Sequence, residues 1–147
     1  GLVDDVGIGV VIRRVGQPFR RRAPEVRLPA STFSHNSWGD SAPGPQQANL
    51  DGHALGTIDV NACAAGDSAF GCRQRIGNVW EWTISLYQDY PYDSVDGREN
   101  PDSSAGRAVR GGSFNNTTNN LRSANRLDFI PGSGFRSVGC RVVSECS

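Results

Sequence analysis

The sequence contains no lysine and no methionine, so all 15 of its basic residues are arginines. They are matched by 15 acidic residues, and the formal net charge is zero. A neutral chain has no general attraction for a polyanion, and we therefore expect no nucleic-acid partner. The sequence also lacks a run of about 18 apolar residues, the shortest stretch that crosses a membrane as a helix, so we expect no membrane span.

Glycine and proline, by contrast, are abundant, with 18 and 8 residues among 147. With a hydrophobic content of 37%, they indicate a loop-rich domain with short strands. We expect an α+β fold with a small twisted antiparallel sheet and reduced helix content. Four strands are predicted, and a long loop should connect the second strand to the third. In the second strand, Trp80 and Trp82 should lie on one face of the sheet and Glu81 on the other. The strands are Val6–Val15, Val79–Trp82, Arg107–Phe114 and Gly139–Val143, and the loop is Tyr87–Gly106.

Four cysteines are present, at Cys63, Cys72, Cys140 and Cys146. Their spacing fits no zinc site, because no CxxC pair occurs and the histidines are remote in sequence. Two local bridges, Cys63–Cys72 and Cys140–Cys146, are the simplest arrangement, although other pairings and a reduced state remain open. Disulfides would indicate an oxidising location, which means extracellular, cell-surface or periplasmic.

Three motifs follow one another along the second half of the chain: Gly77–Trp82 (GNVWEW), Arg110–Phe114 (RGGSF) and Leu121–Arg126 (LRSANR). A closing Gly139–Val143 (GCRVV) comes after them. In this order they resemble the sulfatase-modifying-factor, or formylglycine-generating-enzyme, domain, and the resemblance implies a C-type-lectin-like fold. We assign residues 27–147 to this domain and leave residues 1–26 as an unassigned N-terminal extension.

The segment after Arg27-Leu28-Pro29 departs from the family pattern, which continues with a helix. Ala30–Ser37 has no apolar period of 3.6 and few helix-forming residues. We expect this helix to be lost or reduced to one turn.

The resemblance raises the possibility of oxidative catalysis. Family members that convert a substrate cysteine to formylglycine hold copper on two cysteines just after the GGS strand, because soft thiolates suit Cu(I). The matching window here, Phe114–Asn120, contains asparagine and threonine and no cysteine. A facial iron site would need two histidines and a carboxylate, and neither His35 nor His53 lies in a His-rich motif. We expect neither copper nor iron, and a non-enzymatic domain.

The resemblance also implies structural Ca²⁺ at two places. The first site would use the Gln74 side chain, the carbonyls of Gly77 and Val79, and Glu81. The second would use Asn49, the carbonyl of Leu50, and Asp51. Calcium requires six to eight oxygen ligands, preferably anionic ones. The alternative is that Glu81 pairs with a buried arginine, either Arg110 or Arg141, because a carboxylate between two tryptophans needs a partner.

The C-terminal part closely resembles the variable region of diversity-generating-retroelement proteins, which use this fold to display a binding surface. Exposed aromatic residues beside Asp and Arg would form a recognition patch for a protein or glycan ligand. The alternative is that Phe129 and Phe135 are core residues of an ordinary family member. The predicted ligand-binding residues are Phe114, Asn115, Asn116, Thr117, Asn119, Leu127, Asp128, Phe129, Ser133, Phe135, Arg136 and Ser137.

Two other functions stay open at this point. The predicted strand Val6–Val15 could pair with the sheet edge of a neighbouring copy and build an extracellular self-assembling polymer. A formylglycine-generating type of oxidoreductase is disfavoured, because the catalytic cysteine pair is absent.

Overall fold

The computed structural model describes residues 36, 38–68, 71–93, 95–118, 121 and 124–141. The predicted strand Val6–Val15, and nearly all of the segment at 30–37 where a helix is expected to be lost, lie outside these residues. No helix within the described part is long and apolar enough to cross a membrane.

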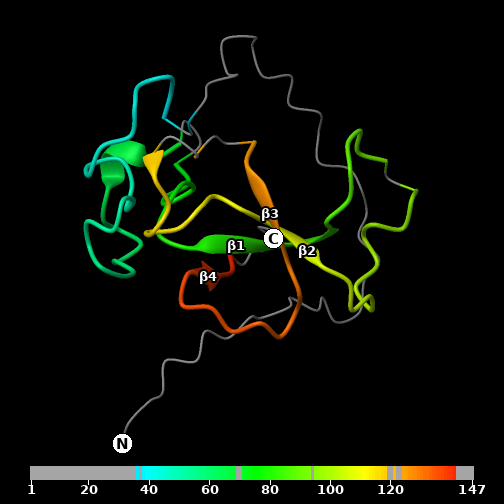
Figure 1. Cartoon of the computed structure of the whole chain (residues 1–147). Helices are drawn as coiled ribbons and strands as arrows, with labels where there is room; N and C mark the ends of the chain where they lie inside the picture. The colour runs from blue at the N-terminus through cyan, green and yellow to red at the C-terminus, as the bar shows by residue number, and fades with distance from the viewer. Residues whose placement is uncertain are drawn as a thin grey trace, which may run out of the picture.

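A four-stranded sheet lies at the centre of the molecule (Figure 1). Its strands are β1 (Trp80–Leu86), β2 (Arg107–Arg110), β3 (Arg126–Phe129) and β4 (Val138–Gly139), in the spatial order β3-β2-β1-β4. A short 3-10 turn, η2 (Ala64–Gly66), precedes them. The prediction of a small sheet in a loop-rich chain is confirmed.

The sheet is mixed, whereas the sequence predicted an antiparallel one. β1 pairs antiparallel with β2 and β2 with β3, but β4 runs parallel to β1. The reason is the connection after β3, which crosses from one edge of the sheet to the other (Figure 1). Such a crossover returns the chain to the end where β3 began, so β4 runs in the direction of β3 and β1.

The limits of the strands also differ from those predicted. β1 continues beyond Trp82 to Leu86. β2 ends at Arg110 because Gly111 and Gly112 adopt positive φ angles of 93° and 75°, which turn the chain out of the strand. β3 is not among the predicted strands, since its residues lie in the window interpreted as a variable loop. Residues 142 and 143 of the predicted last strand lie outside the described residues.

One face of the sheet carries an apolar cluster. The alternation of side chains along β1 places Trp80 and Trp82 on this face and turns Glu81 to the other, as predicted. Residues 109 and 138 complete the buried layer from β2 and β4. The cluster consists of buried Trp80, Val109 and Val138, with Trp82 and Phe129 packed against them.

A second apolar cluster lies beside the turn that leads into β1 and buries Ala48, Leu50, Ile76 and Leu121. At this turn Gly77 has a φ of 80°. The backbone of Gly77 lies so close to Asn49 that a Cβ on Gly77 would be 2.5 Å from the Asn49 carbonyl oxygen. Both the positive φ and the close approach therefore require glycine here.

The next residue, Asn78, connects three parts of the chain. Its Oδ1 accepts hydrogen bonds from Asn49 Nδ2 at 3.0 Å and from the Ile58 backbone N–H at 2.9 Å. Its Nδ2 donates to the Ile58 carbonyl at 3.2 Å, and its carbonyl accepts from the Phe114 N–H at 3.0 Å. The turn thus fixes the segment 49–58 and the segment after β2 relative to the start of β1.

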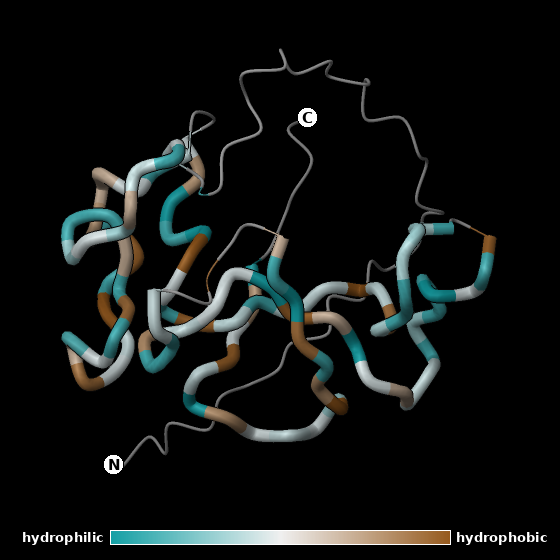
Figure 2. Tube along the Cα trace, turned by 45° about the horizontal axis from the view of Figure 1, so that its top comes forward, coloured by the Kyte–Doolittle hydropathy of each residue, from teal (hydrophilic) through white to brown (hydrophobic). Residues whose placement is uncertain are grey.

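The predicted long loop between β1 and β2 lies at the end of β1 opposite to this turn (Figure 1). Figure 2 shows it mainly in teal and white, so the loop itself contains few strongly hydrophobic residues. Arg107, which is 4% exposed, supports it instead. Its guanidinium donates to the carbonyls of Ile84, Asn100, Pro101 and Ser103. Hydrogen bonds from Arg107, rather than apolar packing, therefore hold this loop in place.

We predict that Gly77→Ala destabilises the protein by about 2–5 kcal/mol, because a left-handed backbone costs about 1–2 kcal/mol and overpacking about 1–3 kcal/mol. Gly97→Ala is the matched control, since Gly97 has a φ of 83° and a Cβ on it would meet no atom within 4 Å. Gly97→Ala should lower the free energy of unfolding only by the cost of the left-handed backbone, about 1–2 kcal/mol. Urea unfolding of both variants measures the difference. Equal losses would show that the approach to Asn49 contributes nothing.

Candidate functional site

The predicted ligand-binding residues fall into two groups. The first forms the turn after β2. Buried Ser113 organises this turn, because its hydroxyl approaches Asn115 Oδ1 at 2.5 Å and Asn116 Oδ1 at 2.8 Å. Asn115 and Thr117 are exposed on its surface, whereas Asn119 lies outside the described residues.

This turn is attached to the loop that contains the predicted calcium ligand Asp51. The Asp51 N–H donates to the Asn116 carbonyl at 3.0 Å, and the Gly52 N–H donates to the Phe114 carbonyl at 2.7 Å. The Thr118 N–H donates in return to Asp51 Oδ1 at 3.2 Å. Phe114 and Asn116 therefore hold the turn in place, which leaves the exposed members of the turn as its candidates for ligand contact.

The second group begins on β3, where Leu127 and Phe129 point to the apolar face of the sheet and Asp128 to the other. The Phe129 ring lies edge-on to Trp82, with centroids 6.3 Å apart, and edge-on to Phe135 at 5.1 Å. Phe129 is thus a packing residue, as the alternative expected. Leu127 and Phe135 remain 41% and 48% exposed, and we call them the Leu127/Phe135 surface.

The rest of this group lies in the crossover connection between β3 and β4. The Ser133 N–H donates to the Ile130 carbonyl at 3.1 Å and closes a tight turn. The Ser137 carbonyl accepts from the Trp80 N–H at 2.8 Å, which ties the connection to β1. Arg136 is exposed, and Ile130 adds further exposed apolar area. The connection is therefore held in a defined shape beside the Leu127/Phe135 surface.

Glu81 forms an ion pair with Arg141, which confirms the ion-pair alternative. Arg141 Nε lies 3.1 Å from both carboxylate oxygens, and its Nη2 lies 2.6 Å from Oε1. The same Nη2 donates to the backbone carbonyls of Arg73 at 2.8 Å and Gln74 at 3.4 Å. The hydrogen bond to Glu81 raises the pKa of Arg141, so this cation is held firmly in its charged form.

The first predicted calcium site does not fit a cation in this arrangement. The guanidinium already occupies both oxygens of Glu81, the one anionic ligand of the predicted set. Gln74 Nε2 donates to the Ala62 carbonyl at 2.8 Å. That leaves the Gln74 amide oxygen and the carbonyls of Gly77 and Val79, which are neutral, next to a positive charge. Among the described residues, no three His, Cys, Asp or Glu side chains gather into a group that could hold a metal.

In the second predicted site, Asp51 Oδ1 accepts from the Thr118 N–H at 3.2 Å, whereas Asn49 Oδ1 is buried and has no hydrogen-bond partner among the described residues. The same holds for Gln74 Oε1 of the first site and for Asp67 Oδ1. A Cβ on Gly66 would be 1.8 Å from the Gln47 carbonyl oxygen, so the chain at Asp67 runs beside the segment leading to Asn49. The other oxygen of Asp67 pairs with Arg73 at 3.4 Å. Asp67 is not among the predicted ligands, because only the structure shows that its oxygen is buried and unpaired.

Cys63, Cys72 and Cys140 carry free thiols. The Cys63–Cys72 bridge expected from the sequence is therefore not formed. Cys63 Sγ points instead to the turn at Pro45 and donates to its carbonyl at 3.3 Å. Because the Cys140 thiol is free as well, the expected Cys140–Cys146 bridge is not present either.

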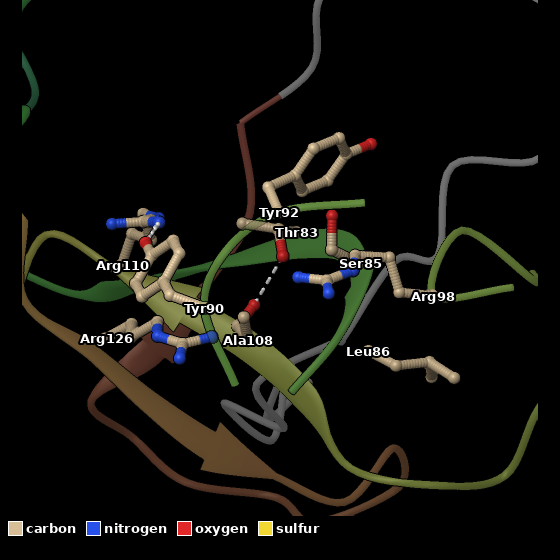
Figure 3. A pocket seen from close by; sticks show the side chains of 9 residues that line it. All are labelled: Thr83, Ser85, Leu86, Tyr90, Tyr92, Arg98, Ala108, Arg110 and Arg126. Atoms are coloured by element: carbon tan, nitrogen blue, oxygen red, sulfur yellow. Dashed lines mark hydrogen bonds between the residues drawn. The ribbon is translucent and has the colours of Figure 1, made fainter. Parts of the chain in front are cut away.

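A pocket of about 80 Å³ opens on the face of the sheet opposite to Trp82 (Figure 3). Alternation along β2 places Ala108 and Arg110 on this face, and their partners on β3 share it. The long loop closes one side with its tyrosines. The lining residues are Thr83, Ser85, Leu86, Tyr90, Tyr92, Arg98, Ala108, Arg110 and Arg126.

Arginines and tyrosines position one another in this pocket, and Figure 3 shows Tyr90 beside Arg110 and Arg126. The Arg126 guanidinium lies 4.2 Å from the centre of the Tyr90 ring and 4.5 Å from that of Tyr87. Arg110 Nη2 donates to the Tyr90 hydroxyl at 2.9 Å. Arg98 lies 4.9 Å from the centre of the Tyr92 ring. These contacts hold three cations around a small space.

Three arginines line the pocket. Arg98 pairs with Asp96 at 2.5 Å, and the Glu99 carboxylate accepts hydrogen bonds from the lining hydroxyls of Ser85 and Tyr92 at 2.7 and 2.9 Å. The hydrogen bond from Arg110 lowers the pKa of Tyr90, and the charges of Arg110, Arg126 and Arg98 lower it further, against the effect of burial. The sequence did not single out these residues. The available signals were two motif arginines, Arg110 and Arg126, and the unusual length of the tyrosine-containing loop.

A family model described as "Sulfatase-modifying factor enzyme 1-like domain" matches residues 22–146. Among curated proteins, the chain is 41% identical over 88 residues to a hercynine oxygenase of Mycolicibacterium thermoresistibile, which covers 52% of this chain and 19% of that protein. It is 44% identical over 54 residues to hercynine oxygenases of Mycolicibacterium smegmatis and Mycobacterium tuberculosis, covering 37% of this chain and 13% of each. The chain thus spans less than a fifth of these relatives.

Among solved structures, the chain is similar to Treponema denticola variable protein 1. The TM-score is 0.57 at 21% identity, and the match covers 76% of this chain and 41% of that chain. This likeness confirms the C-type-lectin-like fold.

We predict that Glu81 and Arg141 are energetically coupled. Replacing each by Gln, singly and together, should give a coupling energy of about 1–2 kcal/mol, reduced by high salt. Arg141→Gln should cost more than Glu81→Gln, because it also removes the donors to the carbonyls of Arg73 and Gln74. Denaturant unfolding of the four proteins measures these terms. Additive losses would show that the two side chains act independently.

Proposed function

Because this chain belongs to the family of sulfatase-modifying factor enzyme 1-like domains, we propose that it uses the domain as a non-catalytic recognition module for a protein or glycan ligand. The observation that carries the proposal is the Leu127/Phe135 surface. Its two members stay 41% and 48% exposed although they lie next to a packed aromatic layer. Rigid, half-exposed apolar side chains on an ordered scaffold are typical of interaction hot spots.

The order of the scaffold supports this function. The Phe129 ring packs edge-on against both Phe135 and Trp82, so Phe135 rests on the packed aromatic layer. The neighbouring connection is tied to β1 through the Ser137 carbonyl. A surface that is fixed before binding loses little conformational entropy when a ligand arrives. The exposed residues of the turn after β2, Asn115 and Thr117, would add polar contacts to a larger ligand.

The ligand chemistry argues against oxidation as the function. The window after β2 that corresponds to the copper-binding segment of the family contains no cysteine. The three described thiols lie elsewhere, two before β1 and one after β4. Neutral amides and hydroxyls do not hold Cu(I) tightly.

Catalysis is the alternative, since curated relatives are named hercynine oxygenases. Their similarity covers less than a fifth of their length, so an activity of the whole protein does not transfer to this chain. Of the two histidines, His53 is exposed and His35 lies outside the described residues. Self-assembly through Val6–Val15 is a further alternative, and that segment also lies outside the described residues.

A structural Ca²⁺ is the second part of the proposal. Asn49, the carbonyl of Leu50 and Asp51 would be its ligands, as the sequence predicts, and the Oδ1 of Asp67, buried and unpartnered among the described residues, is a further candidate on the neighbouring chain segment. The ion would satisfy the unpartnered oxygens of Asn49 and Asp67 and tie the chain around residue 49 to the chain after η2. Its role would be stability of the scaffold.

We predict that the intact chain binds at least one member of an array of defined glycans and peptides. Leu127→Asn and Phe135→Asn should each weaken that binding about tenfold or more, since loss of a hot-spot side chain costs more than about 1.4 kcal/mol. Val95→Asn is the control, because Val95 is 85% exposed but lies in the loop between β1 and β2. The absence of binding to every member, or an equal effect of all three variants, would overturn the proposed surface.

For calcium, we predict that millimolar Ca²⁺ raises the melting temperature by a few degrees and that a chelator reverses the rise. The rise should disappear in Asp67→Asn and persist in Glu81→Gln. Differential scanning calorimetry of the three proteins, each with and without Ca²⁺, provides the measurement. A rise lost only in Glu81→Gln would place the ion at the first predicted site, and no rise in the wild type would exclude a stabilising ion.

A further inference from the structure

Three arginines line the pocket in Figure 3, whereas the carboxylate at its rim, Glu99, is hydrogen-bonded to Ser85 and Tyr92 and forms no ion pair with an arginine among the described residues. The Arg98 side chain is only 6% exposed and is paired with Asp96, so its role is to stabilise the loop. Arg110 and Arg126 have no carboxylate partner among the described residues. The cross-strand neighbour of Arg110 is Glu81, and Arg141 holds that carboxylate. An arginine pair without an internal acid attracts an external one.

The donors of Arg110 are positioned for such an acid. Of the five N–H groups of a guanidinium, one of Arg110 binds the Ala124 carbonyl at 3.2 Å and one binds the Tyr90 hydroxyl at 2.9 Å. Arg126 is fixed by the rings beneath it and by a hydrogen bond to the Gln88 carbonyl at 2.5 Å. Both side chains are therefore immobilised before a ligand binds, and each keeps donors for an oxyanion.

The rim of the pocket carries groups that suit a sugar. Thr83 Oγ1 donates its proton to the Ala108 carbonyl at 2.7 Å, and Ser85 Oγ donates to Glu99 at 2.7 Å. With their protons committed, both oxygens are acceptors for ligand hydroxyls. Tyr90 and Tyr92 are 60% and 50% exposed, which leaves ring surface for the C–H face of a pyranose.

We propose that this pocket binds an acidic sugar, with the carboxylate or sulfate group on Arg110 and Arg126 and the sugar ring against the tyrosines. A volume of about 80 Å³ accommodates one acidic group and the adjoining ring atoms rather than a long chain. The site lies on the face of the sheet opposite to the Leu127/Phe135 surface, because Arg126 and Leu127 are successive residues of β3. This proposal goes beyond the proposed function, and its failure would leave the proposed function untouched.

The test is isothermal titration of the intact chain with four probes. A hyaluronan hexasaccharide carries carboxylates only, and a keratan sulfate tetrasaccharide carries sulfates only. Maltohexaose is the neutral sugar, and hexaglutamate is the acidic peptide. Binding to one or both acidic sugars with a Kd below about 1 mM, and none to maltohexaose, supports the site and identifies its acidic group.

Variants locate the binding. Arg110→Gln should weaken binding of the acidic sugar about tenfold or more. Arg110→Lys keeps the charge but loses the two parallel N–H donors of the guanidinium, and it should weaken binding about threefold. Arg75→Gln is the control, because it removes an exposed arginine that does not line the pocket, and it should leave Kd within twofold. Melting curves establish that each variant is folded, and Arg110→Lys keeps the test valid where Arg110→Gln does not fold.

Three outcomes would overturn the proposal. They are no binding to either acidic sugar, equal binding of maltohexaose, and binding of hexaglutamate as tight as that of the sugars. An effect of Arg75→Gln as large as that of Arg110→Gln would also overturn it, since the attraction would then come from overall charge. None of these outcomes bears on binding through Leu127 and Phe135, which the array measures separately.

Discussion

The close approach of two backbone segments at Gly77 is the constraint on which the rest of the structure depends. A side chain at this position would collide with the Asn49 carbonyl, and the Gly77 N–H donates to the Gly111 carbonyl at 2.8 Å. Asn78 then ties the segment 49–58 and the turn after β2 to the start of β1. Because β2 and β3 are aligned on β1, this turn sets the position of both faces of the sheet. One face presents the Leu127/Phe135 surface and the other presents the arginine pocket.

Arginine replaces apolar packing as the support for the loops. Loop-rich chains leave many carbonyls outside regular ladders, and each buried carbonyl needs a donor. Arg107 supplies four of them, Arg141 supplies two, and Arg98 supplies those of Asp89 and Pro91. A guanidinium suits this work because it offers five donors in one plane. Arg110 and Arg126 also donate to carbonyls, those of Ala124 and Gln88, but both line the pocket and neither has a carboxylate partner among the described residues.

Local patterns in the sequence predicted the local structure. The alternation around Trp80 and Trp82 and the loop after β1 follow from composition and period, and Arg141 was one of two arginines expected for Glu81. The parallel β4 and the strand β3 could not be predicted, because strand pairing depends on where a crossover runs. The pocket was missed for the same reason: Arg110 and Arg126 are distant in sequence from Thr83 and Tyr90, and the four meet only in the fold. The role of Phe129 needed the structure, since an apolar residue in a short strand is equally compatible with core and surface.

The scaffold brings arginines and aromatic rings together, and within its described residues no three His, Cys, Asp or Glu side chains gather into a group that could hold a metal. Recognition rather than transformation is thus the central claim about this chain. The most direct measurement loads the purified chain with Cu(I) or Fe(II), adds a cysteine-containing peptide in air, and analyses the peptide by mass spectrometry. We expect no aldehyde above the level given by the metal alone. Formation of the aldehyde in an amount that increases with protein concentration would contradict the claim.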